Sequence, residues 1–224
     1  MTTTAAPRLT VPESIKPRLR GWLHAGTLPV ALIAGFVLVA LGPTLQARLA
    51  AAVYAITSGL LFGISATYHR GALSPRLGEV LRRLDHANIY LIIAGTYTPF
   101  ALLALDGPAS AVVLGVIWTG AVAGVLFRVL WTGAPRWLST ALYIGLGWTA
   151  VFVLPQLMEG AGVAAVVLVF VGGLLYTAGG IVYGLRRPDP SPRWFGFHEV
   201  FHAFTVAAYL IQYVAVSLVV YAAA

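Results

Sequence analysis

Long apolar stretches alternate with short polar breaks along almost the whole chain. A helix that crosses a membrane needs roughly 20 predominantly apolar residues. Seven stretches of the sequence meet that requirement, at about 24–42, 49–69, 86–105, 109–130, 137–157, 161–185 and 198–222. The breaks between them carry turn-forming residues, such as Gly42-Pro43, Asp106-Gly107-Pro108 and Glu159-Gly160. The pattern predicts an all-α, seven-helix transmembrane domain over residues 24–224 after an N-terminal tail of residues 1–23.

The composition supports this reading and narrows the chemistry. Hydrophobic residues make up 59% of the 224 residues and charged residues 9%, against about 25% charged residues in soluble domains. The first apolar run is long enough to cross a membrane and others follow, so we expect a transmembrane helix rather than a cleaved signal peptide. Because no cysteine is present, a metal must be held by nitrogen or oxygen atoms.

The basic residues predict the orientation of the helices. Of the 14 Lys and Arg residues, all except Arg48 fall in the N-terminal tail or at the second, fourth and sixth loops. The positive-inside rule therefore predicts that the N-terminus is cytoplasmic and the C-terminus lies outside. The net charge of +7 comes from these scattered helix-end residues. They form no basic face that could follow a phosphate backbone, so we expect no nucleic-acid binding.

The residues that could bind a metal or catalyse a reaction lie at the predicted cytoplasmic ends of the helices. The last span opens with His198-Glu199-Val200-Phe201-His202, and two histidines four residues apart lie on one face of a helix. Neutral imidazole is the usual nitrogen ligand of zinc, and catalytic zinc sites use three protein ligands and a water. His69 ends the second span on the same side. We therefore predict a zinc site formed by His69, His198 and His202.

Other readings of the polar residues remain open at this point. An isolated histidine at a helix end is more often a hydrogen-bonded interfacial residue than a ligand. We expect that role for His24 and His86, which have no partner at ligand spacing. Asp85 at the start of the third span can orient a water on the metal or accept its proton, or it can pair with a neighbouring arginine. Ser65, one turn from His69 on the same face, can join the site or simply pack between helices.

At these residues the sequence resembles the hemolysin III family, the bacterial branch of the progestin and adipoQ receptors and a distant relative of the alkaline ceramidases. The matching pieces, in the family's order, are Lys16-Pro17-Arg18-Leu19-Arg20-Gly21-Trp22-Leu23-His24, Ser65-x-x-x-His69, Arg83-Leu84-Asp85-His86-Ala87 and His198-x-x-x-His202. The resemblance implies a seven-helix bundle in the bacterial cell membrane, with zinc near its cytoplasmic face. It implies that His69, His198 and His202 are the zinc ligands and that Asp85 holds the zinc-bound water. It also implies that Ser65 completes the family's set of site residues, which consists of a serine, an aspartate and the histidines.

The expected function is a zinc-dependent hydrolase of amide-containing lipids that acts in membrane homeostasis. Asp85 would be the general base, Ser65 would stabilise the developing oxyanion, and the apolar bundle interior would accept an acyl chain. One alternative is a non-enzymatic regulator of membrane fluidity or energetics, or a pore-forming cytolysin, with a structural zinc. A third is an intramembrane metalloprotease that uses Glu199 as its base, although on a helix Glu199 points about 100° away from His198.

Overall fold

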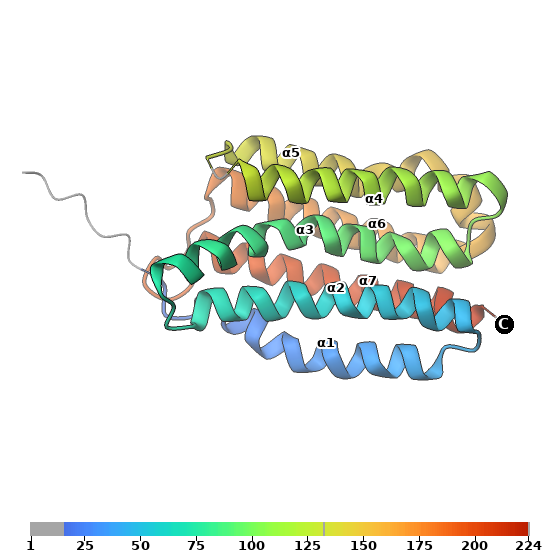
Figure 1. Cartoon of the computed structure of the whole chain (residues 1–224), viewed down its shortest axis with the longest axis horizontal. Helices are drawn as coiled ribbons and strands as arrows, with labels where there is room; N and C mark the ends of the chain where they lie inside the picture. The colour runs from blue at the N-terminus through green and yellow to red at the C-terminus, as the bar shows by residue number, and fades with distance from the viewer. Residues whose placement is uncertain (1–15, 132, 224) are drawn as a thin grey trace, which may run out of the picture.

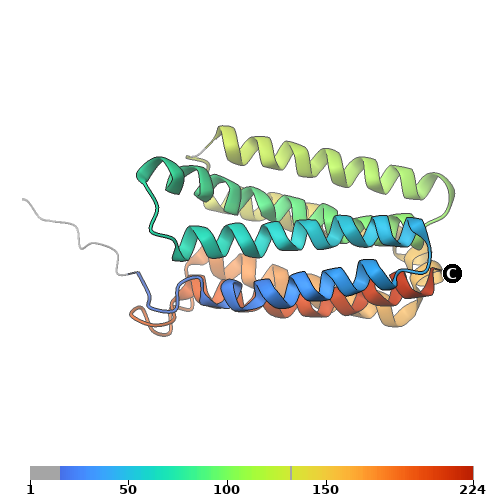
Figure 2. The same ribbon diagram turned by 60° about the horizontal axis from the view of Figure 1, so that its bottom comes forward.

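The computed structural model describes residues 16–131 and 133–223, so the predicted tail is described only from Lys16 onward. Within these residues the chain forms seven α-helices and one short 3-10 helix, which run side by side along the long axis of the molecule (Figures 1 and 2). Their bounds are α1 (Trp22–Leu41), α2 (Leu45–Arg70), α3 (Pro75–Leu103), α4 (Gly107–Leu130), α5 (Arg136–Gly147), the 3-10 helix η1 (Trp148–Val153), α6 (Leu154–Leu185) and α7 (Phe197–Ala222). The predicted all-α class is confirmed for the part of the chain that is described.

The fifth and sixth apolar stretches form one continuous helical segment that changes direction at Gly162. This residue has φ 78° and ψ 158°, a conformation that glycine adopts without strain. On either side of it the segment packs against itself, because Trp148 Nε1 donates to Thr177 Oγ1 at 3.0 Å and Gly180 lies against Thr140. The two halves therefore run antiparallel, and the chain turns two residues later than the predicted break at Glu159-Gly160.

The outer surface of the bundle is apolar. Among the described residues, five helical segments are long and apolar enough to cross a membrane: α1, α2, α4, Arg136–Leu185 and α7. Large side chains such as Phe36 and Phe152 are 73% and 85% exposed on them. Soluble proteins rarely expose an apolar surface that covers so many helices. The fold is therefore a helical bundle whose apolar outer faces suit a lipid environment.

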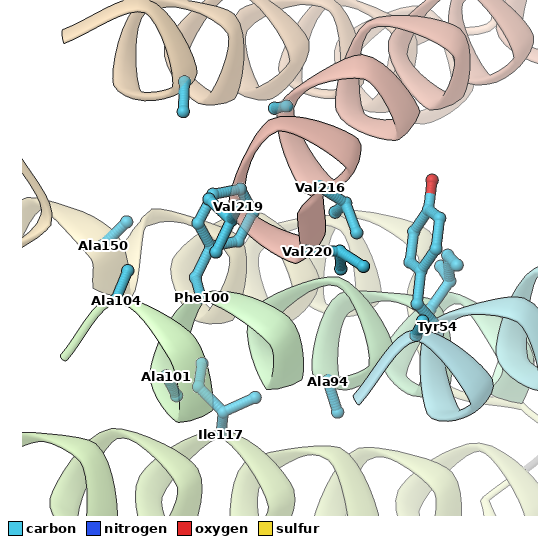
Figure 3. Packing of buried hydrophobic residues seen from close by; sticks show 14 of the residues in the cluster. Tyr54, Ala94, Phe100, Ala101, Ala104, Ile117, Ala150, Val216, Val219 and Val220 are labelled. Atoms are coloured by element: carbon cyan, nitrogen blue, oxygen red, sulfur yellow. The ribbon is translucent and has the colours of Figure 1, made fainter. Parts of the chain in front are cut away.

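Burial separates the central helices from the peripheral ones. Half of the most apolar window of α2 and 44% of that of α7 is buried, against 22% in α1 and in α4. In the core, Tyr54 of α2, Phe100 of α3, Ile117 of α4 and Val216 of α7 belong to one buried cluster (Figure 3). The two helices that carry the predicted zinc ligands, α2 and α7, thus lie at the centre of the bundle, where their positions are constrained by packing.

Basic residues gather at one end of the bundle, where α1, α3, α5 and α7 begin and α2, α4 and α6 end (Figure 1). Contacts between distant segments hold this end together. Arg83 NH1 of α3 donates to the carbonyl of Val129 on α4 at 3.3 Å, and the backbone N–H of Arg18 donates to the carbonyl of Arg193 at 3.0 Å. Among the described Lys and Arg residues, Arg48 lies at the other end. All the predicted site residues lie at the basic end.

Candidate metal centre

The first turn of α7 is fixed by Glu199. Its carboxylate is 1% exposed and forms an ion pair with Arg20 of the N-terminal segment. Its Oε2 also accepts a hydrogen bond from the backbone N–H of Gly196 at 2.8 Å, which satisfies a donor that precedes the helix. The N-terminal segment passes close to α2 at Gly21, which has φ +80° and where a Cβ would lie 2.6 Å from that of His69. These contacts set the rotation of α7 and therefore the direction of its histidines.

The three predicted ligands come together between α2 and α7. His69, His198 and His202 each offer a nitrogen atom, and these atoms lie within 4.8 Å of one another. Nε2 of His69 is 3.1 Å from Nε2 of His198. The rings of His69 and His202 are 6% and 2% exposed, so the cluster is shielded at the end of the bundle.

The type of the donors and the shortest separation between their nitrogens fit a zinc ion. Zinc–nitrogen distances of about 2.0–2.1 Å in a tetrahedral site place two ligand nitrogens about 3.3 Å apart, close to the separation between His69 and His198. The same separation also suits a hydrogen bond between two imidazoles. A hydrogen bond, however, accounts for two rings, whereas three nitrogens converge here. The donor set of three imidazoles matches that of catalytic zinc sites that leave one position for water.

Asp85 lies beside the histidines and not in an ion pair with its neighbours. Its Oδ2 is 3.6 Å from Nε2 of His69. Arg82 and Arg83 instead bind Glu79, with N–O distances of 2.8 and 2.9 Å. The hydrogen bonds from Arg83 and Arg82 hold the pKa of the Glu79 carboxyl below its usual range. The arginine pairing considered for Asp85 is therefore wrong, because Glu79 one to two turns earlier on α3 takes both arginines.

Ser65 is 1% exposed on α2, one turn before His69. Its hydroxyl is buried near the Asp85 carboxyl, and it makes no hydrogen bond of normal geometry with the described residues. Ser65 and Asp85 line the same cavity as His198 and His202. A buried hydroxyl without a partner is unfavourable unless a water or ligand satisfies it. The structure thus brings all five predicted site residues to one place.

The prediction of interfacial hydrogen bonding is wrong for His24. Its ring is 2% exposed and stacks on His202, with ring centroids 3.8 Å apart and planes 8° from parallel. Neither ring nitrogen has a hydrogen-bond partner among the described residues. Helix α1 packs against both α2 and α7, and this contact carries His24 from the helix end into the interior. His86 makes the hydrogen bonds predicted for it, at 2.7 Å to the carbonyl of Arg82 and 2.9 Å to the hydroxyl of Tyr183.

Two cavities of opposite character meet at the histidine layer. The apolar cavity runs through the bundle interior from His198 and His202 past Ile93 to Phe100 and Leu157. On the basic side lies a polar cavity of about 960 Å³, which we call the vestibule. Its lining includes Lys16, Arg20, Arg82, Arg128, Arg136 and Arg186. Asp85, His86 and His198 line both cavities, so the candidate site separates a polar entrance from an apolar interior.

Residues 13–213 match the family model described as "Haemolysin-III related". The chain belongs to the hemolysin III family. It is similar to hemolysin-3 of Bacillus cereus, with 32% identity over 163 residues that cover 73% of this chain and 71% of that protein. It is also similar to a hemolysin-3 homolog of Bacillus subtilis strain 168, with 31% identity over 149 residues, which are 66% and 67% of the two chains.

The range matched by the hemolysin III model includes every candidate residue from Arg20 to His202. The resemblance seen in the sequence is therefore confirmed at the level of the family. Together with the apolar outer surface and the five long apolar segments, this family places the chain in the cell membrane as a multi-pass protein.

Proposed function

We propose that this hemolysin III protein is a zinc-dependent hydrolase of amide-containing lipids. The observation that carries the proposal is the position of the three histidines. Their nitrogens converge where the polar vestibule meets the apolar cavity, and the Asp85 carboxylate lies 3.6 Å from one of them. An amphiphilic substrate would place its headgroup in the vestibule, its acyl chain in the apolar cavity and its amide bond at the histidine layer. Its role would lie in maintaining the membrane.

The proposed bundle has seven spans with the site on the cytoplasmic side. Helix α3 supplies one span after its charged first turns, and the two antiparallel halves around Gly162 supply two more. The basic end of the bundle then faces the cytoplasm. The described chain begins at this end, and α7 ends at the opposite one (Figure 1), which supports a cytoplasmic N-terminus and an outside C-terminus.

His69, His198 and His202 would hold the metal. When bound, zinc supplies a Lewis acid and makes water a nucleophile at neutral pH. Asp85 would accept a proton from the attacking water at Oδ2 and pass it to the leaving nitrogen as the C–N bond breaks. The Ser65 hydroxyl would donate a hydrogen bond to the substrate carbonyl oxygen as negative charge develops there. The surrounding apolar side chains would keep bulk water from the acyl chain.

A second candidate is a non-enzymatic membrane regulator or a pore-forming cytolysin in which zinc is structural. The name of the Bacillus cereus relative, hemolysin-3, favours this candidate, as does the origin of the ligands on two different helices, α2 and α7, which a metal would brace together. The metalloprotease alternative receives less support, because both carboxylate oxygens of Glu199 are engaged by Arg20 and by the Gly196 N–H.

A lipid-hydrolysis assay on three zinc-loaded samples separates these functions: wild type, Asp85→Asn and Glu199→Gln. For the proposed hydrolase, Asp85→Asn retains zinc and loses hydrolysis of N-acyl lipids, while Glu199→Gln remains active per folded, zinc-loaded molecule. A zincin-like protease reverses the two results. Wild-type inactivity across a broad panel of N-acyl lipids would contradict the hydrolase and favour the structural-zinc protein.

A further inference from the structure

Arg128 is a buried cation with no counter-ion among the described residues. It lies in the last turn of α4 and is 8% exposed. One of its terminal nitrogens donates to Ser139 Oγ at 3.0 Å, and its Nε has no hydrogen-bond partner among the described residues. The ion pairs within the described chain involve Arg20, His69, Arg82 and Arg83, so none reaches Arg128. A buried charge is strongly unfavourable unless it is paired.

Arg128 faces the vestibule, and its surroundings there are also positive. Arg136 and Arg186 line the same cavity and have no ion pair among the described residues. The hydroxyl of Tyr90, another lining residue, is buried and has no partner within the described chain. Gly124, one turn before Arg128, allows α4 to approach the ring of Tyr90, since a Cβ at position 124 would lie 2.3 Å from that ring.

The carboxylates that line the vestibule do not neutralise this wall. Asp85 lies at the histidine site, and Asp189 accepts a hydrogen bond from the backbone N–H of Phe197 at 2.8 Å. Glu199 and Glu79 do not line the vestibule, and they form ion pairs with Arg20 and Arg82. Among the described residues, the α4–α5 side of the vestibule therefore presents positive charge that no carboxylate of the chain pairs with.

We propose that this wall binds the anionic headgroup of an amphiphile, with Arg128 as its principal contact. A guanidinium matches a carboxylate or phosphate through two parallel hydrogen bonds, and Ser139 holds the Arg128 side chain in place. The acyl chain of the same molecule extends past Asp85 and His198, which line both cavities, into the apolar cavity. The proposed substrate class is thus an amide lipid with an anionic headgroup. This refinement rests on the proposed hydrolase for turnover, while the binding itself does not require turnover.

The test is native mass spectrometry of the zinc-loaded full chain in a neutral detergent. Two lipids of similar size serve as probes: N-palmitoylglycine, which carries a carboxylate, and N-palmitoylethanolamine, which is neutral. We expect N-palmitoylglycine to bind at least about tenfold more tightly to the wild type, because the charge-assisted bonds form with it alone. Arg128→Gln is expected to abolish the difference, and Arg128→Lys to retain part of it. Arg76→Gln, at an exposed position of the same end outside the vestibule lining, is the matched control.

Arg128→Gln removes an unpaired buried charge, so its melting temperature is expected to equal or exceed that of the wild type; Arg136→Gln provides a second test if the first variant does not fold. Equal binding of the two lipids by the wild type would overturn the inference. So would a preference for N-palmitoylglycine that is unchanged in both Arg128→Gln and Arg136→Gln. Inorganic phosphate serves as a third probe, for a soluble anion. If phosphate bound as tightly as N-palmitoylglycine, the proposal that a lipid occupies this site would be wrong. Binding of the intact lipid that depends on Arg128, without hydrolysis, would support the headgroup site and contradict the proposed hydrolase. Hydrolysis of both lipids that does not depend on Arg128 would support the hydrolase and contradict the headgroup site.

Discussion

Replacing Arg20 with methionine is expected to destabilise the protein strongly, because it leaves Glu199 buried without its cation. The carboxylate is 1% exposed and Arg20 is 20% exposed. Removing one partner of a buried ion pair costs about 3–5 kcal/mol. The partial exposure of Arg20 and the remaining hydrogen bond from Gly196 favour the lower end of that range, about 3 kcal/mol. For a chain of this size, each kcal/mol lowers the melting temperature by about 2–4 °C, so the expected fall is about 6–12 °C.

The measurement is thermal unfolding of the zinc-loaded protein in a neutral detergent. The matched control is Arg18→Met, which removes a neighbouring exposed arginine that lies 4.5 Å over the ring of Trp194, a contact worth about 1 kcal/mol or less. Glu199→Gln is expected to cost less than Arg20→Met, because it retains an acceptor for Gly196 and leaves the charge on the more exposed partner. If Arg20→Met melted within about 2 °C of Arg18→Met, the buried-pair argument would fail.

Two further predictions concern the site and the orientation of the bundle. His24→Ala and His86→Ala are each expected to keep the zinc, because the nitrogens that converge belong to the other three histidines; zinc analysis of the purified variants checks this, and loss of the metal in either variant would make that residue part of the site. Reporter fusions at the two ends are expected to place the N-terminus in the cytoplasm and the C-terminus outside, and two reporters on the same side would rule out seven spans.

The all-α class and the meeting of His69, His198 and His202 could be predicted because each depends on local rules. A helix in lipid must be apolar for about 20 residues, and residues four apart on a helix share a face. Assigning His69 to the same site as His198 and His202 required one further step. The basic loops predict that α2 ends and α7 begins on the same side of the membrane, so these histidines lie at a similar depth. These rules apply to each helix separately and do not depend on how neighbouring helices pack.

Features that depend on contacts between distant segments could not be predicted in this way. Arg20 pairs with Glu199 across 179 positions of sequence, and His24 stacks on His202 only because α1 packs against α7. The piece of sequence that resembles the family includes His24 but does not indicate its contact with His202. The lack of an ion pair to Arg128 within the described residues likewise depends on which carboxylates the fold brings near. A count of charges at the helix ends does not distinguish Arg128 from the other arginines at that end.

His69, His198 and His202 are proposed to hold one zinc ion between α2 and α7. Elemental analysis of protein purified without a histidine tag tests this proposal most directly, with the wild type compared with His69→Ala and His202→Ala. We expect about one zinc per folded chain in the wild type, since three shielded imidazoles suit zinc's tetrahedral coordination, and we expect both variants to lose most of the metal. A zinc-free wild type, or variants that retain as much zinc as the wild type, would contradict it.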